Sequence, residues 1–233
     1  MNILAIDTCM AACSAAVLRT GPDERLFRRF ERMDRGHAEA LFPMIGAVMA
    51  EAGLAFAALD CIAVTLGPGT FTGVRAGLAA ARGLALAVKV PVAGAGSLAV
   101  MAMGCVSEIG ESLRGEGFMV ARDARRGEIY CQCFDMRGQA LCEAEIMAAG
   151  EAAEKLPAAM SLIVGSGAAA VAGEGQRCKR GLIAELPDLL PDAGQLARFA
   201  LHLPHCEQPP APLYLRAPDA KPQLNKSFAR AQS

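Results

Sequence analysis

Tryptophan is absent from the sequence, and only 5% of its 233 residues are aromatic. This scarcity disfavours a protein that holds single-stranded nucleic acid by stacking the bases on aromatic side chains. The net charge is also small, with a formal value of -1 at pH 7. The chain as a whole therefore has no general attraction for nucleic acid, and any contact with it must be local or shared with a partner.

Histidine is scarce as well, and the three histidines include no His-x-x-x-His pair that would place two imidazoles on one helix face. A zinc or iron hydrolase site is therefore unsupported. The nine cysteines are odd in number and contain no Cys-x-x-Cys motif. We interpret them as buried free thiols of a reducing compartment rather than as disulfides or metal ligands.

The sequence also shows no pattern typical of a secretory leader or of a membrane-spanning helix. The apolar start is already a strand that runs into Asp7. The long apolar region 76–103 is interrupted by Arg82, Lys89 and Pro91. We expect a globular, cytoplasmic protein of one or two domains with no membrane partner.

The most informative segment that is present is the glycine-rich stretch 66–77, LGPGTFTGVRAG. It follows an apolar run, 61–66, that predicts a buried strand, and it precedes a small-residue helix at about 73–88. Thr70 or Thr72 can cap this helix. A strand, a glycine turn and a capped helix start present backbone N–H groups to an anion.

The known phosphate-loop motifs nevertheless fail here. A Walker-type loop ends in Gly-Lys-Ser/Thr, and no lysine lies between Gly67 and Val88. The dinucleotide fingerprint needs a glycine where this chain has Thr72. An anion site and a tight turn with a packing role both remain open for this segment.

Two expected helices have more small or apolar residues than a single buried face requires. In helix 73–88, Gly73, Gly77 and Ala81 recur at four-residue spacing, which allows another helix to approach closely. The expected helix 37–52 has an apolar set wider than one stripe. These features fit either burial against the chain's own sheet or a dimer or partner contact.

The order of the expected elements indicates the fold class. Strands at 3–6, 12–18 and 25–32 form an antiparallel meander, and the first half then continues to give the order βββαβαβα. This α/β order is typical of one lobe of the actin-like, sugar-kinase and Hsp70 (ASKHA) class, whose first hairpin turn meets phosphate. Asp7 and Thr8 would lie in that turn, unless Asp7 only caps it.

The second half begins with a similar meander but is too short for a second full lobe that closes over a nucleotide. The elements expected there are strands at 118–121, 128–134, 141–147 and 161–164 and helices at 151–155 and 193–201.

The expected organisation is therefore a complete N-terminal lobe, 1–108, and a reduced C-terminal lobe, 109–216. The polar segment 217–233 is expected to be a disordered tail.

A polar cluster, Asp123 with Arg125 and Arg126, forms the first turn of the second meander. Either arginine neutralises the aspartate there, or the turn makes an anion or partner contact, since arginine recognises phosphate and carboxylate bidentately.

Taken together, several segments resemble the TsaB (YeaZ) family, over nearly the whole chain to about residue 216. The glycine-phenylalanine-arginine motif within 67–77 is highly specific. Thr70 replaces a usual serine but keeps the hydroxyl, and Cys9 replaces another serine, which leaves the first turn less polar. The segments that carry the resemblance are 3–8, 37–39 with Pro43, 67–77, 123–126 with Tyr130, and 214–216.

The resemblance implies a non-catalytic scaffold subunit of the bacterial machinery that forms N6-threonylcarbamoyladenosine (t6A) at position 37 of ANN-decoding tRNAs. It implies dimerisation with a TsaD-type catalytic paralogue, work with a TsaE-type ATPase, contact with tRNA through the complex, and a homodimer when the chain is alone. No cofactor of its own is implied; ATP and metal are expected on the partner subunits. The older M22 glycoprotease label finds no support, and the competing hypothesis is an autonomous actin-like phosphotransferase or hydrolase.

The resemblance also assigns residues, none of them catalytic or metal-binding. Asp7, Thr8, Asp123, Arg125 and Arg126 are candidates for an anion, nucleotide or tRNA contact. On the interface assignment, Gly77→Leu is expected to weaken partner binding and leave the monomer folded. The expected partner or dimer interface consists of His37, Leu41, Met44, Ile45, Val48, Gly67, Gly69, Thr70, Phe71, Thr72, Gly73, Val74, Arg75, Gly77 and Ala81.

Overall fold

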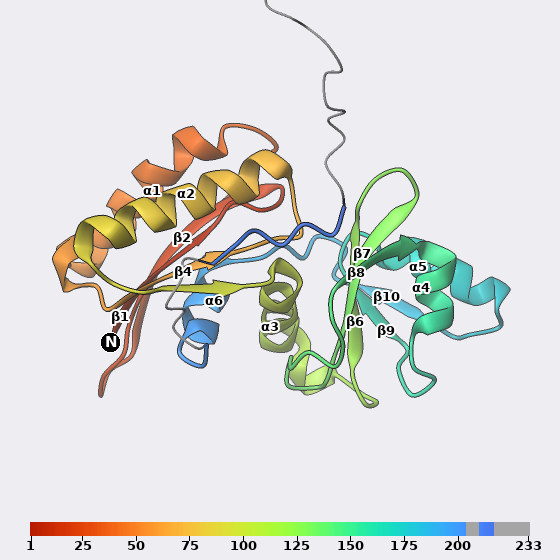
Figure 1. The fold of residues 1–233 in the computed structure, drawn as a ribbon. Helices are drawn as coiled ribbons and strands as arrows, with labels where there is room; N and C mark the ends of the chain where they lie inside the picture. The colour runs from red at the N-terminus through yellow and green to blue at the C-terminus, as the bar shows by residue number, and fades with distance from the viewer. Residues whose placement is uncertain (204–209, 217–233) are drawn as a thin grey trace, which may run out of the picture.

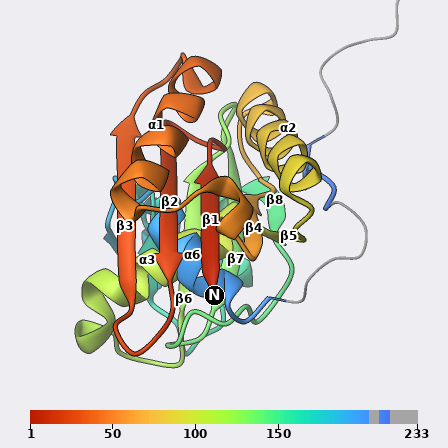
Figure 2. The ribbon, with the colours of Figure 1, turned by 90° about the vertical axis from the view of Figure 1, so that its left-hand side faces the viewer.

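Residues 1–203 and 210–216 are described by a computed structural model, in which two five-stranded sheets stand side by side (Figure 1). The expected disordered tail, 217–233, and His205 lie outside the described residues. The N-terminal sheet has the order β3-β2-β1-β4-β5, which Figure 2 shows with α1 and α2 on its nearer side. Its strands are β1 (Asn2–Asp7), β2 (Ala12–Arg19), β3 (Arg25–Arg32), β4 (Cys61–Thr65) and β5 (Val92–Ala95).

The predicted βββαβαβα order of the first half is confirmed. β1, β2 and β3 form the expected antiparallel meander, and β4 and β5 add in parallel. Alternate residues of the buried strands face opposite sides of the sheet. One side packs against α1 (His37–Ala52) and α2 (Phe71–Val88), which begins two residues before the expected start of its helix. A 3-10 turn, η1 (Phe56–Ala58), leads into β4.

The C-terminal sheet repeats this topology with shorter strands. Its order is β10-β9-β6-β7-β8, in which two strands of three residues, β9 and β10, occupy the places of β4 and β5. The lobe is therefore reduced in strand length and keeps the strand count. Its elements are β6 (Phe118–Asp123), β7 (Glu128–Phe134), β8 (Glu145–Ala148), α4 (Ala149–Lys155), β9 (Leu162–Val164), α5 (Ala168–Arg177) and β10 (Ile183–Glu185).

Two elements of this lobe were not expected. α5 contains Gly173 and Gly175, which lower its helix propensity and mask its pattern. β10 has only three residues and all of them are exposed, so its sequence lacks the alternation of apolar and polar residues that predicts a half-buried strand. β8 begins later than the expected strand 141–147, because Leu141 and Ala140 instead pair with the end of β7.

The two lobes exchange a helix each. α3 (Ser97–Ile109), which continues into the 3-10 turn η2 (Gly110–Ser112), leaves the N-terminal sheet and packs on the C-terminal one. α6 (Ala193–Ala200) comes from the second half and packs on the N-terminal sheet. Both lie between the sheets in Figure 1. The expected boundary at 108/109 divides the chain by sequence, but α3 and α6 each pack on the sheet of the other lobe. The expectation that α6 belongs to the C-terminal lobe is therefore corrected: α6 is part of the N-terminal core.

The chain returns to the N-terminal lobe once more after α6. Leu213 N donates to Leu66 O over 2.7 Å, and Arg82 donates to Pro210 O over 2.6 Å. The segment 210–214 thus lies against α2 and the end of β4.

One helix, α2, is long and apolar enough to cross a membrane by length and composition alone, and 39% of that window is buried inside the protein. Its inward residues, which include Val74, Leu78 and Ala81, belong to the hydrophobic cores of the protein. α2 is a core helix of the N-terminal lobe.

Candidate functional site

The glycine-rich segment is a packing turn that clamps the start of α2 onto the β1–β2 turn. Thr70 caps the helix by accepting a hydrogen bond from Gly73 N over 3.1 Å. The Thr8 hydroxyl donates to Gly73 O over 2.7 Å, and Thr70 N donates to Cys9 O over 2.7 Å. A Cβ on Gly69 would lie 2.2 Å from Cys9 O, so the two backbones approach more closely than any side chain allows.

Asp7 and Thr8 are buried in this clamp, with 0% and 1% of their surface exposed. Asp7 Oδ1 accepts hydrogen bonds from the Thr65 hydroxyl and from Cys9 N, while Asp7 Oδ2 has no partner among the described residues. Burial raises the pKa of Asp7 from 3.8 to about 7, although the hydrogen bond from Thr65 opposes the shift. The expected anion contact through these two side chains is not supported, because neither is open to a ligand.

The interface residues expected on α1 and α2 divide into an inner and an outer set. Gly73 and Gly77 face the β1–β2 turn, and Cβ atoms there would lie 2.0 Å from Thr8 O and 2.5 Å from Thr8 Oγ1 respectively. The small-residue stripe therefore packs within the monomer. The expectation that Gly77→Leu leaves the monomer folded is corrected, because a leucine side chain has no room at this position. Also buried among the expected interface residues are Leu41, Ile45, Val48, Gly67, Val74 and Ala81.

The residues that α1 and α2 turn to solvent are largely different ones. Phe42 is 55% exposed on α1 and Leu86 is 82% exposed on α2. Gly46 on α1 and Gly83 on α2 have open space where a Cβ would be, and Ala79, one turn before Gly83, is exposed. We refer to Phe42, Gly46, Ala79, Gly83 and Leu86 as the outer face. The sequence contained the signal for it, a second stripe of small and apolar residues offset from the glycine stripe.

An aromatic and arginine cluster flanks the outer face at the start of α2. The Arg75 guanidinium lies 3.4 Å from the centroid of the Phe71 ring, and Arg75 Nε donates to the Tyr214 hydroxyl over 2.9 Å. Phe71 and Tyr214 stack with their centroids 5.5 Å apart. Of the expected interface residues, Thr70, Phe71, Thr72 and Arg75 are exposed. Stacking holds the arginine in one orientation while leaving the cluster accessible.

His37, Met44 and Gly69, the remaining expected interface residues, are half-buried. His37 Nε2 lies 2.8 Å from Met10 O. Because a carbonyl only accepts, Nε2 carries the proton of this hydrogen bond. His37 thus ties the start of α1 to the β1–β2 turn.

The expected arginine turn lies opposite the β1–β2 turn, across the space between the lobes. Asp123 Oδ1 accepts a hydrogen bond from Arg125 N over 2.8 Å, and Arg125 and Arg126 have left-handed φ angles of 63° and 59°. Arg216 donates to Ala124 O over 3.0 Å and pairs with the Glu128 carboxylate. A cavity of about 340 Å³ separates this turn from Cys9, Met10, Gly69 and Thr70.

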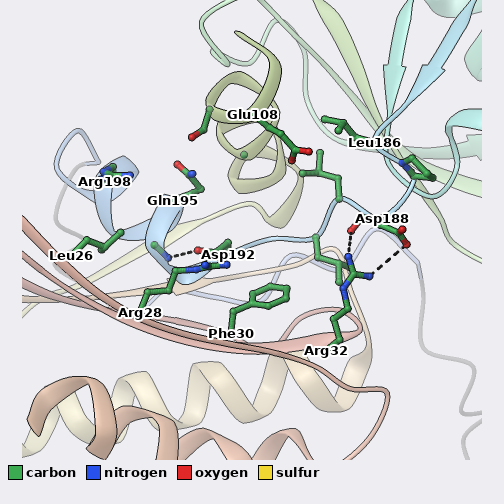
Figure 3. A pocket seen from close by; sticks show the side chains of 16 residues that line it. Leu26, Arg28, Phe30, Arg32, Glu108, Leu186, Asp188, Asp192, Gln195 and Arg198 are labelled. Carbon is green, nitrogen blue, oxygen red and sulfur yellow. Dashed lines mark hydrogen bonds and ion pairs between the residues drawn. The ribbon is translucent and has the colours of Figure 1, made fainter. Parts of the chain in front are cut away.

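A larger cavity, of about 760 Å³, lies between β3, α3, α6 and the chain after β10 (Figure 3). Two of its arginines are paired within the protein: Arg28 contacts Asp192 at 2.5 Å, and Arg32 contacts Asp188 at 3.5 Å. Because these ion pairs join β3 of the first lobe to the chain that returns from the second, we interpret this cavity as part of the seam between the lobes.

Comparison with known proteins is consistent with this architecture. The family model described as "TsaD: tRNA N6-adenosine threonylcarbamoyltransferase" matches residues 31–187. The tRNA threonylcarbamoyladenosine biosynthesis protein TsaB of Escherichia coli is 37% identical over 130 residues, a match that covers 56% of this chain and 53% of that protein. The match thus spans about half the length of that relative.

Two further relatives match over nearly their whole length. An uncharacterised protein of Mycobacterium tuberculosis is 35% identical over 223 residues, which cover 95% of this chain and 94% of that protein. The solved structure of YeaZ from Pseudomonas aeruginosa is 33% identical and has a TM-score of 0.76; the match covers 92% of this chain and 99% of that chain.

Proposed function

Because this chain belongs to the TsaB (YeaZ) family, we propose that it is a non-catalytic scaffold subunit in the formation of t6A on tRNA. In this proposal it pairs with a TsaD-type catalytic subunit, works with a TsaE-type ATPase and reaches tRNA through the complex. ATP and metal belong to the partner subunits. The site of its action is the cytoplasm.

The observation that carries the scaffold role is the outer face of α1 and α2. A phenylalanine and a leucine that are 55% and 82% exposed lie there beside two glycines with open space around them. Exposed apolar side chains next to small residues let a partner helix approach closely and bury apolar area, so they favour a helix-to-helix interface. The same face serves a second copy of the chain when the catalytic partner is missing.

The burial of Asp7 and Thr8 supports the scaffold role over an autonomous phosphotransferase. An ASKHA enzyme needs polar groups of its first turn open to a phosphate, and in this chain that turn is filled by the start of α2. Turnover of ATP by the isolated chain would favour the autonomous enzyme instead.

Depletion of this protein from cells is expected to lower the t6A content of tRNA at least tenfold, because the catalytic subunit loses its scaffold. Mass spectrometry of tRNA nucleosides measures the loss, and re-expression of the wild-type chain is the control that restores it. An unchanged t6A content after depletion would contradict the proposed function.

Gly83→Leu is expected to weaken association at the outer face at least tenfold, because it adds bulk where a partner helix approaches. The variant should remain folded, since a Cβ at Gly83 meets nothing within 4 Å and leucine has the higher helix propensity. Light scattering of the chain alone, and with its TsaD-type partner, measures the effect.

The matched control is Gly173→Leu, at an exposed position of α5 that also has nothing within 4 Å. This variant should associate as the wild type does. Equal association of both variants, or equal weakening of both, would remove the outer face as the interface.

A further inference from the structure

The C-terminal sheet carries a group of cysteines that the scaffold role does not use. The eight cysteines in the described part of the chain are free, and six of them are buried, as the sequence predicts. The prediction of burial is wrong for Cys142 and Cys178, which are exposed. Cys142 lines a cavity together with two buried cysteines of β7, Cys131 and Cys133.

The path of the chain after β7 brings Cys142 onto Cys133. Leu141 N donates to Cys133 O over 2.9 Å, which continues the antiparallel pairing at the end of β7. The chain then bends at 141–142 and leaves the ladder. Cys133 N donates to Cys142 Sγ over 3.4 Å, and Gln132 Nε2 donates to Cys142 O over 2.9 Å. These three hydrogen bonds hold the two cysteines next to each other.

The two thiols differ in their access to solvent. Cys142 is exposed, whereas only 8% of the surface of Cys133 is exposed. Burial raises the pKa of Cys133 to about 12, and the neighbouring Cys142 and Cys131 thiols and a hydrogen bond with Cys142 add to the rise. Because the thiolate is the reactive form of cysteine, Cys133 is inert by itself. Cys142 is the thiol that a reagent in solution reaches first.

The cavity that the thiols line measures about 300 Å³ and lies between β7, the chain before β8 and the end of α4. Its two charged residues, Glu145 and Lys155, pair with each other over 3.4 Å, so it carries no excess charge. Such a cavity admits a small uncharged molecule to the sulfur atoms. Its apolar surface comes from Met119, Leu141, Met147 and Pro157.

We propose that Cys142 and Cys133 are a site of reversible oxidation by hydroperoxides, which joins them in a disulfide. The Cys142 thiolate attacks the terminal oxygen of the hydroperoxide, so that an S–O bond forms and the O–O bond breaks. The leaving oxygen takes up the proton that the Cys142 thiol released. This inference goes beyond the scaffold role and does not depend on it.

The second step forms the disulfide. The Cys133 sulfur attacks the sulfur of the Cys142 sulfenic acid, the S–S bond forms, and the S–O bond breaks. The hydroxide that leaves takes up the Cys133 proton and becomes water. In total the two thiols lose two electrons, and the hydroperoxide is reduced to an alcohol and water, or to two waters in the case of hydrogen peroxide.

The first step makes the second one easier. Conversion of Cys142 to an uncharged sulfenic acid removes the effect of its charge on the pKa of Cys133. Attack by Cys133 is intramolecular, so it competes with further oxidation of Cys142. Cys131 also lines the cavity, but the hydrogen bond to Cys142 Sγ comes from Cys133. We therefore assign Cys133, and not Cys131, as the partner.

The test oxidises the full, previously reduced chain with hydrogen peroxide and, in parallel, with cumene hydroperoxide. Remaining thiols are alkylated, and peptides are mapped by mass spectrometry with and without reduction. The expected product is a pair of peptides joined through Cys133 and Cys142, which dithiothreitol separates. Faster formation with cumene hydroperoxide identifies an organic hydroperoxide as the preferred oxidant, and the reverse order identifies hydrogen peroxide.

Serine variants assign the roles of the two thiols. Cys142→Ser is expected to lower the yield of disulfide at Cys133 at least tenfold. Cys133→Ser is expected to leave Cys142 as a sulfenic acid, which dimedone traps in at least tenfold higher yield than in the wild type. Because Cys142 is exposed, its variant keeps the test valid even if Cys133→Ser fails to fold.

The control variant is Cys178→Ser, which removes an exposed thiol outside the cavity. It should form the Cys133–Cys142 disulfide within twofold of the wild-type yield. Two results would overturn the proposal. In the first, Cys142 of the treated wild type stays a thiol, is recovered as sulfinic or sulfonic acid, or is joined to a cysteine other than Cys133. In the second, Cys178→Ser lowers the disulfide yield as much as Cys142→Ser does.

Discussion

Gly73→Ala is expected to lower the free energy of unfolding by about 3 kcal/mol or more, the upper range for overpacking of a close contact. The added Cβ would lie 2.0 Å from Thr8 O and 2.6 Å from Thr70 Oγ1. To relieve the overlap, α2 must move away from the β1–β2 turn and lose the hydrogen bond between Thr8 Oγ1 and Gly73 O. Urea unfolding of the two proteins measures the difference.

The same substitution elsewhere on α2 separates this steric cost from helix propensity. Gly83→Ala has no atom within 4 Å of its new Cβ. It is expected to stabilise the protein by about 0.8 kcal/mol, the advantage of alanine over glycine within a helix. If Gly73→Ala behaved like Gly83→Ala, the clamp between α2 and the first turn would be far looser than the structure indicates.

Asp7→Asn is expected to make the protein more stable at alkaline pH relative to the wild type. The folded state raises the pKa of this carboxyl from 3.8 to about 7, so the folded protein holds its proton more tightly than the unfolded chain. The stabilisation linked to that proton is complete below pH 3.8 and is lost as the pH rises towards 7. At pH 8 the ionised carboxylate opposes folding by about 4 kcal/mol.

Asparagine has nearly the same shape and no titratable proton, so it removes this pH dependence. The difference in unfolding free energy between Asp7→Asn and the wild type is expected to shift by about 2.5 kcal/mol in favour of the variant between pH 5 and pH 8. The exposed Asp23 provides the control, because Asp23→Asn should produce no such shift. A constant difference across this pH range would contradict a protonated Asp7 in the folded protein.

The membership of the TsaB family and the ASKHA-like order of the first half were both predictable from the sequence. The strands of the first meander are long and separated by short turns, so the sequence pattern identifies each of them. The C-terminal lobe was harder, because its helix α5 carries glycines and its strand β10 is wholly exposed. β10 is stabilised by its pairing with β9, and α5 by its packing on the C-terminal sheet. Neither contact is visible in the local sequence.

The face of α2 that points inward could not be deduced from hydrophobicity. Both sides of the helix carry glycine and alanine, so the pattern alone does not choose between the stripe with Gly73 and the stripe with Gly83. The choice is made by the fit of Gly73 against Thr8, a contact across 65 residues.

The exchange of α3 and α6 between the sheets bears on how the chain matures during synthesis. The N-terminal sheet is complete once β5 has been made, yet its lower face, with Ile3 and Ala5, is covered by α6. Residues 193–200 leave the ribosome roughly five to twenty seconds later, at typical elongation rates. A nascent first lobe therefore carries an open apolar face while residues 96–192 are being made, until α6 appears and covers it.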